Sequence, residues 1–414
     1  MVIMTEMSTG KPEIGWRTTV TLPSDYDIAI IGAGPVGLFM ANLVGLAGVA
    51  TARAPGSIPL ERPKQIVARA DALLYLHLAR PDLDKATKFL TDFGLLPAAR
   101  QGDTVHFSGV GENPVIYSVT RAKRPALLSV GLSVPERASL HALAKESGAT
   151  PAPFTGPGGG EMVRLRDPDG VCIEVLHGQA KVAPVPSRPA IPHNAPAQTV
   201  RTNDTQRPRL APPEVTKLGH LVLASPNFPR KVQWYMRMLG FIPSDVMCLP
   251  DATPAGAFLR LDRGATPSDH HTLFLAIGAA ADIDHAAFEV IDLDAVEMGQ
   301  QVLKAAGYKH AWGVGRHLLG SQIFDYWRDP WGLKHEHYAD GDVFDASQPP
   351  GYHKLDREGL YQWGPDLPDD FVAARPTLGQ LASLLRGAMR GDVALRPLLA
   401  AARSMRAPSR PWQR

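Results

Sequence analysis

Two histidines and one glutamate lie where a chain could bind a metal ion. His220 opens the apolar run 218–224, and His285 lies in the stretch Asp-His-Ala-Ala-Phe-Glu-Val. Glu336 follows the turn 329–332, Asp-Pro-Trp-Gly. Each stretch is typical of a strand, and alternation along strands points the three side chains toward one sheet face. Two imidazoles and a carboxylate are the ligand set of a mononuclear non-haem iron(II) site, which leaves part of the metal open to a substrate and dioxygen.

Further motifs surround these three residues in a fixed order. They are Gly315-Arg316-His317, the run Phe-Asp-Tyr-Trp-Arg-Asp-Pro-Trp-Gly at 324–332, and Glu336-His337-Tyr338 with Asp340-Gly341-Asp342. Through them the segment 217–342 resembles the catalytic module of type I extradiol catechol dioxygenases, members of the vicinal oxygen chelate superfamily. The resemblance implies that dioxygen is inserted into a catechol ring beside its two hydroxyls, at iron(II), with manganese(II) possible on the same ligands.

The same resemblance implies roles for groups around the metal. His271 would be the acid–base residue beside dioxygen, His317 a hydrogen-bond partner of a substrate oxygen, and Tyr326 the phenol facing the deprotonated hydroxyl. His270 competes with His271, because the family's usual gap to the second ligand favours His270 while the motif His-Thr-Leu-Phe favours His271. We predict His271. The other histidines are interpreted as solvent-exposed or outer groups: His106, His141, His177, His193, His310, His335 and His337.

An internal repeat predicts how the chain positions these residues. Pro81 to Pro97 parallels Pro226 to Pro243, and the Asp-Pro-Asp-Gly turn at 167–170 parallels the turn at 329–332. The repeat predicts an α+β fold of two tandem modules, each built from paired βαβββ units as in the vicinal oxygen chelate fold. The predicted modules are residues 72–178, called the first module, and residues 214–345, called the second module.

The first module lacks the ligand set. Glu174 occupies the place of Glu336, but Leu74 or Tyr75 and Ser129 stand where the second module has histidines. We therefore expect the first module to be non-catalytic. A proline-rich linker, 179–213, joins the modules.

The two ends of the chain lie outside the repeat, and each has its own prediction. Residues 1–65 combine a disordered start with a strand and the motif Gly-Ala-Gly-Pro-Val-Gly at 32–37, which resembles the opening of flavin-dependent aromatic hydroxylases. The next strand reads Ala-Thr-Ala-Arg-Ala-Pro at 50–55, without the acidic residue that holds a ribose. We expect a truncated, vestigial Rossmann-like segment that binds no FAD. Residues 346–414 form a C-terminal extension with an aromatic loop and a helix from Thr377, interrupted at Pro397.

Composition excludes several classes of function. The chain has 414 residues, 44% hydrophobic residues and a net charge of +2, so we expect neither nucleic acid nor a membrane as a partner. Two cysteines, Cys172 and Cys248, suit the reducing cytoplasm, and we expect a homo-oligomer by resemblance.

Two alternatives use the same scaffold. One is a metal-dependent relative of the glyoxalase or isomerase type, and the other is a metal-free, drug-sequestering binding module. The candidates for the substrate cavity wall are Trp234, Met247, Phe274, Trp312, Trp327 and Trp331.

Overall fold

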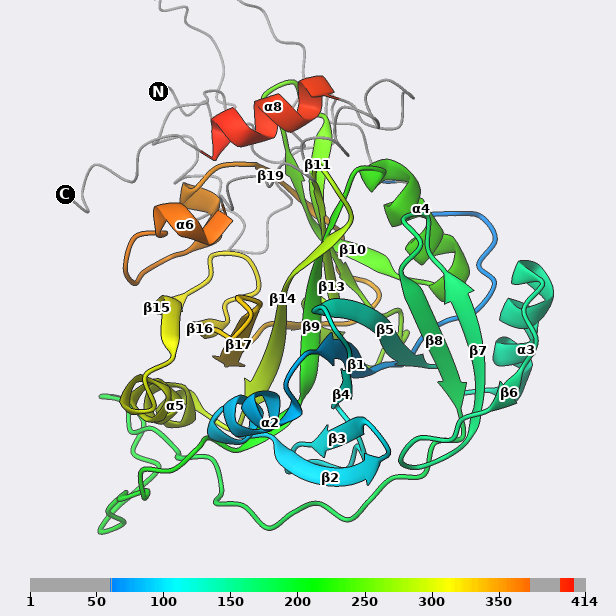
Figure 1. Cartoon of the computed structure of the whole chain (residues 1–414). Helices are drawn as coiled ribbons and strands as arrows, with labels where there is room; N and C mark the ends of the chain where they lie inside the picture. The colour runs from blue at the N-terminus through cyan, green and yellow to red at the C-terminus, as the bar shows by residue number, and fades with distance from the viewer. Residues whose placement is uncertain (1–59, 61, 373–394, 406–414) are drawn as a thin grey trace, which may run out of the picture. The chain divides into compact units, whose positions relative to one another are not determined.

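The computed structural model describes residue 60, residues 62–372 and residues 395–405 (Figure 1). The predicted Rossmann-like segment, residues 1–65, lies outside these ranges except for residue 60 and residues 62–65. The start of the predicted helix from Thr377 also lies outside them. Pro397 lies near the start of the described part of α8 (Leu395–Ser404), where its fixed φ is compatible with helical geometry, and the residues that would show the expected interruption lie outside the described ranges. Among the described residues, every helix is too short or too polar to span a membrane.

The first module forms one eight-stranded mixed sheet with two covering helices. Its strand order is β2-β3-β4-β1-β5-β8-β7-β6. In chain order the elements are β1 (Ala72–Arg80), α2 (Leu83–Asp92), β2 (Leu96–Gln101), β3 (Thr104–Ser108), β4 (Tyr117–Arg121), β5 (Ala126–Ser133), α3 (Arg137–Ser147), β6 (Ala152–Pro153), β7 (Glu161–Arg166) and β8 (Cys172–His177).

The second module repeats this plan in a nine-stranded sheet of order β15-β16-β17-β14-β9-β13-β11-β10-β19. Its elements are β9 (Val215–Ser225), α4 (Phe228–Leu239), β10 (Ile242–Cys248), β11 (Pro254–Arg260), β12 (Ser268–Asp269), β13 (Leu273–Ile277), β14 (Asp282–Val290), α5 (Leu293–Ala305), β15 (Lys309–Arg316), β16 (Ile323–Arg328), β17 (Lys334–Ala339), β18 (Val343–Phe344) and β19 (Gly351–Lys354). A 3-10 turn (Glu358–Leu360), α6 (Asp369–Val372) and α8 (Leu395–Ser404) follow. The α+β fold of tandem modules is confirmed, and β19 extends the second sheet past residue 345.

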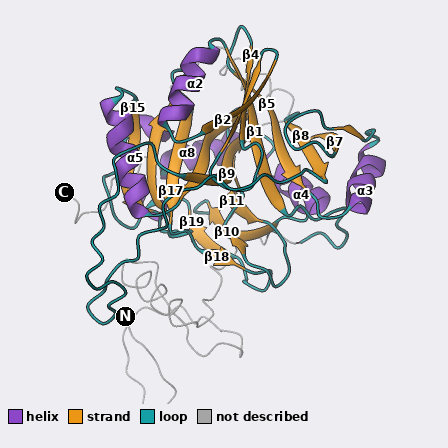
Figure 2. Ribbon diagram, turned by 90° about the horizontal axis from the view of Figure 1, so that it is seen from below, coloured by secondary structure: helices purple, strands orange, loops and turns teal. Residues whose placement is uncertain are grey.

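Local sequence accounts for the two equivalent helices of the repeat. The Asp82 side chain accepts hydrogen bonds from the backbone N–H groups of Asp84 and Lys85, which caps α2. α4 ends at Gly240, whose φ of 71° is the left-handed conformation that glycine adopts at little cost. The apolar side of each helix packs on its sheet, as the repeated pattern predicts. α2 and α5 lie side by side, and Tyr308, just after α5, donates to Asp92 of α2 (Figure 2).

The modules share one hydrophobic core, and β17 lies at their boundary. His335 and His337 point from β17 toward the first module and are fully buried. His337 stacks on Phe93 with ring centroids 3.7 Å apart, and its Nε2 lies 2.7 Å from the Phe93 carbonyl. The Tyr117 hydroxyl lies 2.9 Å from His335 Nε2. Of the interpretation of these two histidines as solvent-exposed or outer groups, the solvent-exposed part is wrong, because the first module covers this face of the strand.

The repeated Asp-Pro-x-Gly turns form buried ion pairs between the two modules. In each turn Oδ1 of the first aspartate, Asp167 or Asp329, accepts backbone N–H bonds that close the turn. Oδ2 of Asp167 lies 3.0 Å from Nζ of Lys231 on α4 in the other module. Oδ2 of Asp329 lies 2.7 Å from a guanidinium nitrogen of Arg80 on β1. Each module thus holds the turn of the other by a buried ion pair.

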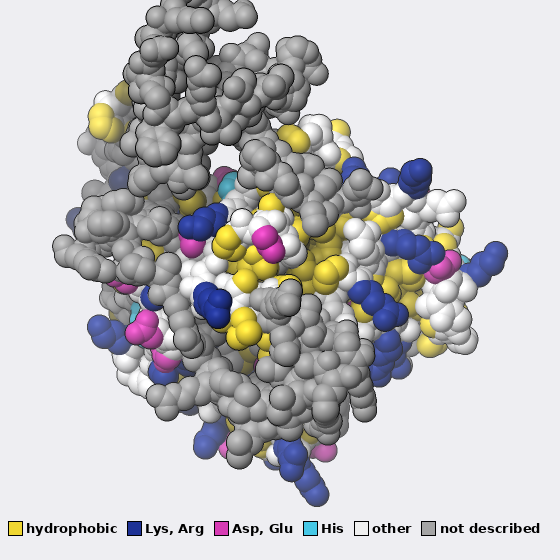
Figure 3. All heavy atoms as spheres, turned by 90° about the horizontal axis from the view of Figure 1, so that it is seen from above, with side chains coloured by type: hydrophobic (Ala, Val, Ile, Leu, Met, Phe, Trp, Pro, Cys, Tyr) yellow, Lys and Arg dark blue, Asp and Glu magenta, His cyan; other side chains and the backbone are white. Residues whose placement is uncertain are grey.

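The proline-rich linker follows the surface as an extended chain. The guanidinium of Arg188 donates twice to the carboxylate of Asp292, at 2.6 and 2.8 Å, and Asp292 is also the N-cap of α5. The backbone N–H of Val182 donates to the Glu112 carbonyl. On the face shown in Figure 3, basic side chains appear at several places, with acidic ones beside some of them.

Candidate metal centre

The three predicted ligands lie on adjacent central strands of the second sheet. Ala287 of β14 is the register partner of both His220 on β9 and Glu336 on β17, so the strands bring the two side chains together across β14. Oε2 of Glu336 lies 3.2 Å from Nε2 of His220 and 3.3 Å from Nε2 of His285. One possible ligand atom from each residue falls within 4.8 Å of the other two. A single ion could reach all three side chains.

Burial makes this arrangement costly without an ion. Glu336 is fully buried, and neither of its carboxylate oxygens, nor Nε2 of His285, has a hydrogen-bond partner among the described residues. The nitrogens are close to the carboxylate, yet they are not aligned as hydrogen-bond donors to it. Burial raises the pKa of Glu336, but the imidazoles of His220, His285 and His317 outweigh burial and hold it well below its usual range. An ionised carboxylate beside imidazole nitrogens is an arrangement that could hold a cation.

Tyr326 and His317 lie next to the three predicted ligands. Nε2 of His317 is 2.9 Å from the Tyr326 hydroxyl and 3.6 Å from Oε1 of Glu336. Burial, and next the charge of Glu336, raise the pKa of Tyr326 well above its usual value, so its phenol stays protonated. The Leu360 carbonyl accepts from Nδ1 of His317, which leaves Nε2 toward the site. The aromatic loop of the C-terminal extension therefore orients this histidine.

The two adjacent histidines occupy different positions. The ring of His271 lies 4.1 Å from the ring of His220, measured between centroids. The ring nitrogens of His270 contact other groups: its Nδ1 lies 2.9 Å from Nδ1 of His271, and its Nε2 lies 2.6 Å from Oδ2 of Asp245. Burial, and next the proximity of His220, lower the pKa of His271 well below its usual value, so its imidazole is neutral. His271 is at the ligands and His270 is behind it, bonded to Asp245, whose other oxygen lies 2.6 Å from Nε2 of His353.

The equivalent place in the first module is filled by protein groups. Gly131 is the register partner of both Tyr75 and Glu174, as Ala287 is in the second module. Tyr75 therefore occupies the position of His220, which decides between Leu74 and Tyr75. The hydroxyls of Tyr75 and Ser129 donate to Oε2 of Glu174 at 2.8 and 2.7 Å, and Arg164 donates to Oε1 at 2.8 Å. This carboxylate is fully satisfied without a metal.

Two of the candidate wall residues lie near the ligands. The ring of Trp312 stacks on that of Tyr326, with centroids 5.8 Å apart. Phe274 stacks on Phe258, whose ring lies 4.9 Å from that of His271. Aromatic side chains therefore lie against Tyr326 and against His271, which suits a planar aromatic ligand.

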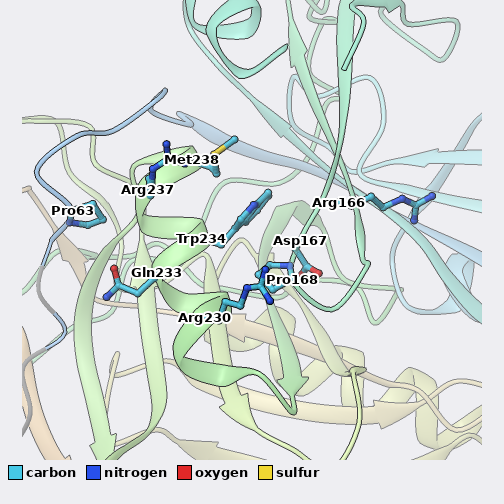
Figure 4. A pocket seen from close by; sticks show the side chains of 9 residues that line it. All are labelled: Pro63, Arg166, Asp167, Pro168, Arg230, Gln233, Trp234, Arg237 and Met238. Carbon is cyan, nitrogen blue, oxygen red and sulfur yellow. Dashed lines mark hydrogen bonds between the residues drawn. The ribbon is translucent and has the colours of Figure 1, made fainter. Parts of the chain in front are cut away.

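Other candidate wall residues lie elsewhere. Trp234 on α4 lines a surface hollow of about 490 Å³ together with Arg230 and Arg237 (Figure 4). Trp331 lies in its turn against the guanidinium of Arg80. The indole N–H of Trp327 donates to Asp325.

Sequence reasoning missed several residues that support the site: Asp245, Asp284, Lys334 and His353. Two of them carried a local signal. Asp284 directly precedes the predicted ligand His285. Lys334 lies two positions before the predicted ligand Glu336, and residues two apart on a strand share one face. Asp245 and His353 are 108 positions apart and gave no such signal.

Comparisons with known proteins show which proteins this chain resembles. The model of the glyoxalase/bleomycin resistance protein/dioxygenase superfamily matches residues 217–336. Metapyrocatechase 2 from Cupriavidus necator is 34% identical over 318 residues, covering 76% of this chain and 94% of that protein. The Mn(II)-bound glyoxalase from Novosphingobium aromaticivorans aligns with a TM-score of 0.63 and 25% identity, over 75% of this chain and 97% of that one.

A further solved structure shares the fold at lower identity. Homoprotocatechuate 2,3-dioxygenase from Arthrobacter globiformis aligns with a TM-score of 0.61 and 20% identity, over 75% of this chain and 94% of that one. These matches span nearly the whole length of each relative, so the similarity concerns both modules together.

Proposed function

Because this chain belongs to the extradiol dioxygenases of the glyoxalase/bleomycin resistance protein/dioxygenase superfamily, we propose that His220, His285 and Glu336 hold the divalent metal at which it cleaves a catechol-type ring with dioxygen. The observation that carries the proposal is the buried carboxylate of Glu336, which has imidazole nitrogens at 3.2 and 3.3 Å and no hydrogen-bond partner among the described residues.

The donor set fits iron(II). Two nitrogens and one oxygen can bind either iron(II) or manganese(II), and the sites of non-haem iron(II) oxygenases use this combination. Bound there, iron(II) would hold both catechol oxygens beside dioxygen and let electron density pass between them. We take iron(II) as the resident metal. Manganese(II) is the alternative, since the Novosphingobium glyoxalase of similar fold is Mn(II)-bound.

The neighbouring side chains would handle protons and orient the substrate. The neutral imidazole of His271, beside His220, can accept a proton from a catechol hydroxyl and return it later in the reaction. The protonated phenol of Tyr326 can donate a hydrogen bond to the resulting catecholate oxygen. His317, oriented by the Leu360 carbonyl, can hold a second oxygen in place. Trp312 and Phe274 exclude water from the ring.

Oxygen consumption tests the proposal directly. Protein prepared without air, freed of metal and reloaded with iron(II) is expected to consume one dioxygen per catechol and form a yellow ring-fission product. Suitable substrates are 2,3-dihydroxybiphenyl, 3-methylcatechol, 4-methylcatechol and a carboxylated catechol, which differ in size and charge. Metal-loaded protein that consumes no oxygen with any of them, but isomerises a glutathione adduct, would establish the glyoxalase-type alternative. Binding of a drug by metal-free protein would instead support the sequestering module.

Removing the phenol should separate catalysis from metal binding. Tyr326→Phe is expected to keep its iron and to slow ring cleavage by about a hundred-fold, as for loss of a positioned proton donor. His271→Asn should behave alike, with a larger loss than His270→Asn. The checks are metal analysis and the single-turnover rate, and Tyr308→Phe, a phenol bonded to Asp92, is the matched control. A larger loss in His270→Asn would exchange the roles of the two histidines.

A further inference from the structure

A carboxylate binds the imidazole of the predicted metal ligand His285 on the side away from Glu336. Its Nδ1 lies 2.8 Å from Oδ2 of Asp284, while its Nε2 lies 3.3 Å from Glu336. A carboxylate at Nδ1 keeps the proton on that nitrogen and leaves the lone pair of Nε2 for a metal. It also fixes the plane of the imidazole ring, because Nδ1 must then point at Asp284 and Nε2 at Glu336.

Asp284 could not keep this position alone. Its side chain is 37% exposed, so water could compete for the carboxylate. Lys334, whose side chain is only 5% exposed, binds the other oxygen, with Nζ to Oδ1 at 2.8 Å. His285 and Lys334 are register partners on β14 and β17, so the sheet itself sets this ion pair beside the ligand.

Lys334 also joins the site to the C-terminal extension. Its ammonium donates to the Phe371 carbonyl of α6 at 2.9 Å and lies 3.9 Å from the centre of the Phe371 ring. The same ring meets Tyr326 edge-on, with centroids 5.0 Å apart, and Trp312 at 5.1 Å. One residue of α6 therefore contacts both the phenol of the site and the group that anchors Asp284.

We propose that Asp284, anchored by Lys334 and α6, is the positioning residue of the metal ligand His285 and sets how tightly the centre holds its ion. This inference rests on the proposed function, because it takes His285 as a ligand. It adds that metal retention depends on a contact made by the C-terminal extension, outside the segment that carries the ligands.

Metal binding by the full chain, measured without substrate, tests the proposal. Metal-free protein is titrated with Mn²⁺ alone, and free Mn²⁺ is followed by its electron paramagnetic resonance signal. Asp284→Ala is expected to weaken Mn²⁺ binding by about 10- to 100-fold, the usual cost of losing the outer partner of a ligating histidine. Asp284→Asn, which can still accept from Nδ1–H, should recover part of this loss. Lys334→Met should weaken binding less than Asp284→Ala.

The matched control is Asp282→Asn. It removes the same charge two residues earlier on β14, and the described contact of its carboxylate is with the backbone N–H of Ile283. Its Mn²⁺ affinity should be unchanged, and the metal-free urea midpoints of Asp284→Asn and Asp282→Asn should agree. With Co²⁺ at saturation, the visible spectrum should shift in Asp284→Ala, since the orientation of His285 changes.

The outcomes are distinguishable. Equal Mn²⁺ affinity in Asp284→Ala, Asp284→Asn and the unaltered protein overturns this inference and leaves the proposed function intact. An equal loss in Asp282→Asn would assign the effect to general charge and also overturn it. An unaltered protein that binds no Mn²⁺, Fe²⁺ or Co²⁺ removes the proposed function and this inference together.

Discussion

Glu336→Gln is expected to leave the protein folded but without metal, and to lower ring cleavage by at least about 10,000-fold. The substitution keeps the shape of the side chain and removes the one anionic ligand, so two neutral imidazoles remain to hold a dication. The carboxylate is also buried among three imidazoles, whose interactions favour its ionised form. Metal analysis after dialysis and oxygen uptake with excess iron(II) measure the two effects.

The first module supplies the matched control. Glu174→Gln makes the same change at the equivalent register position, where Tyr75, Ser129 and Arg164 bind the carboxylate. This variant should retain its metal and activity and lose about 1–2 kcal/mol of unfolding free energy, since charge-assisted hydrogen bonds become neutral ones. A loss of metal in Glu174→Gln equal to that in Glu336→Gln would show that the wrong module has been assigned.

Lys231→Met is expected to destabilise the whole protein by about 3–5 kcal/mol, because it leaves two buried carboxylates without their cation. The side chains of Lys231, Asp167 and Asp169 are at most 1% exposed, and Nζ lies 3.0 and 2.8 Å from the two carboxylates. Methionine retains the aliphatic stem, so the loss reports the charge rather than packing.

The urea midpoint measures this loss, and Arg230→Met is the control. Arg230 is the exposed neighbour of Lys231 on α4, and its replacement should change the unfolding free energy by less than about 0.5 kcal/mol. Similar midpoints for the two variants would mean that the buried ion pairs do not hold the modules together.

The sequence predicted the parts of the site that short motifs carry. His220, His285 and Glu336 could be identified because each lies in a strand pattern and the alternation of a strand fixes its face. The repeat predicted the fold and the lack of a metal-ligand set around Glu174. The assignment of these residues as ligands and of His271, His317 and Tyr326 as their neighbours stays a prediction, although the structure brings all six together.

The sequence could not predict which part of the chain packs against each face of a strand. The alternation of β17 shows that His335 and His337 oppose Glu336, but not that the first module covers them. The contact of Lys334 with Phe371 joins positions 37 residues apart through a turn of the extension that follows no periodic pattern. Such contacts follow from how modules pack, which a local pattern does not encode.

The reciprocal ion pairs at the two Asp-Pro-x-Gly turns make the halves of this chain interdependent. A second module produced alone would expose the apolar face beneath His335 and His337 and leave Lys231 and Asp329 with unmatched charges. The second module therefore needs the first for its stability, although the first carries Tyr75 and Ser129 where the second carries His220 and His285.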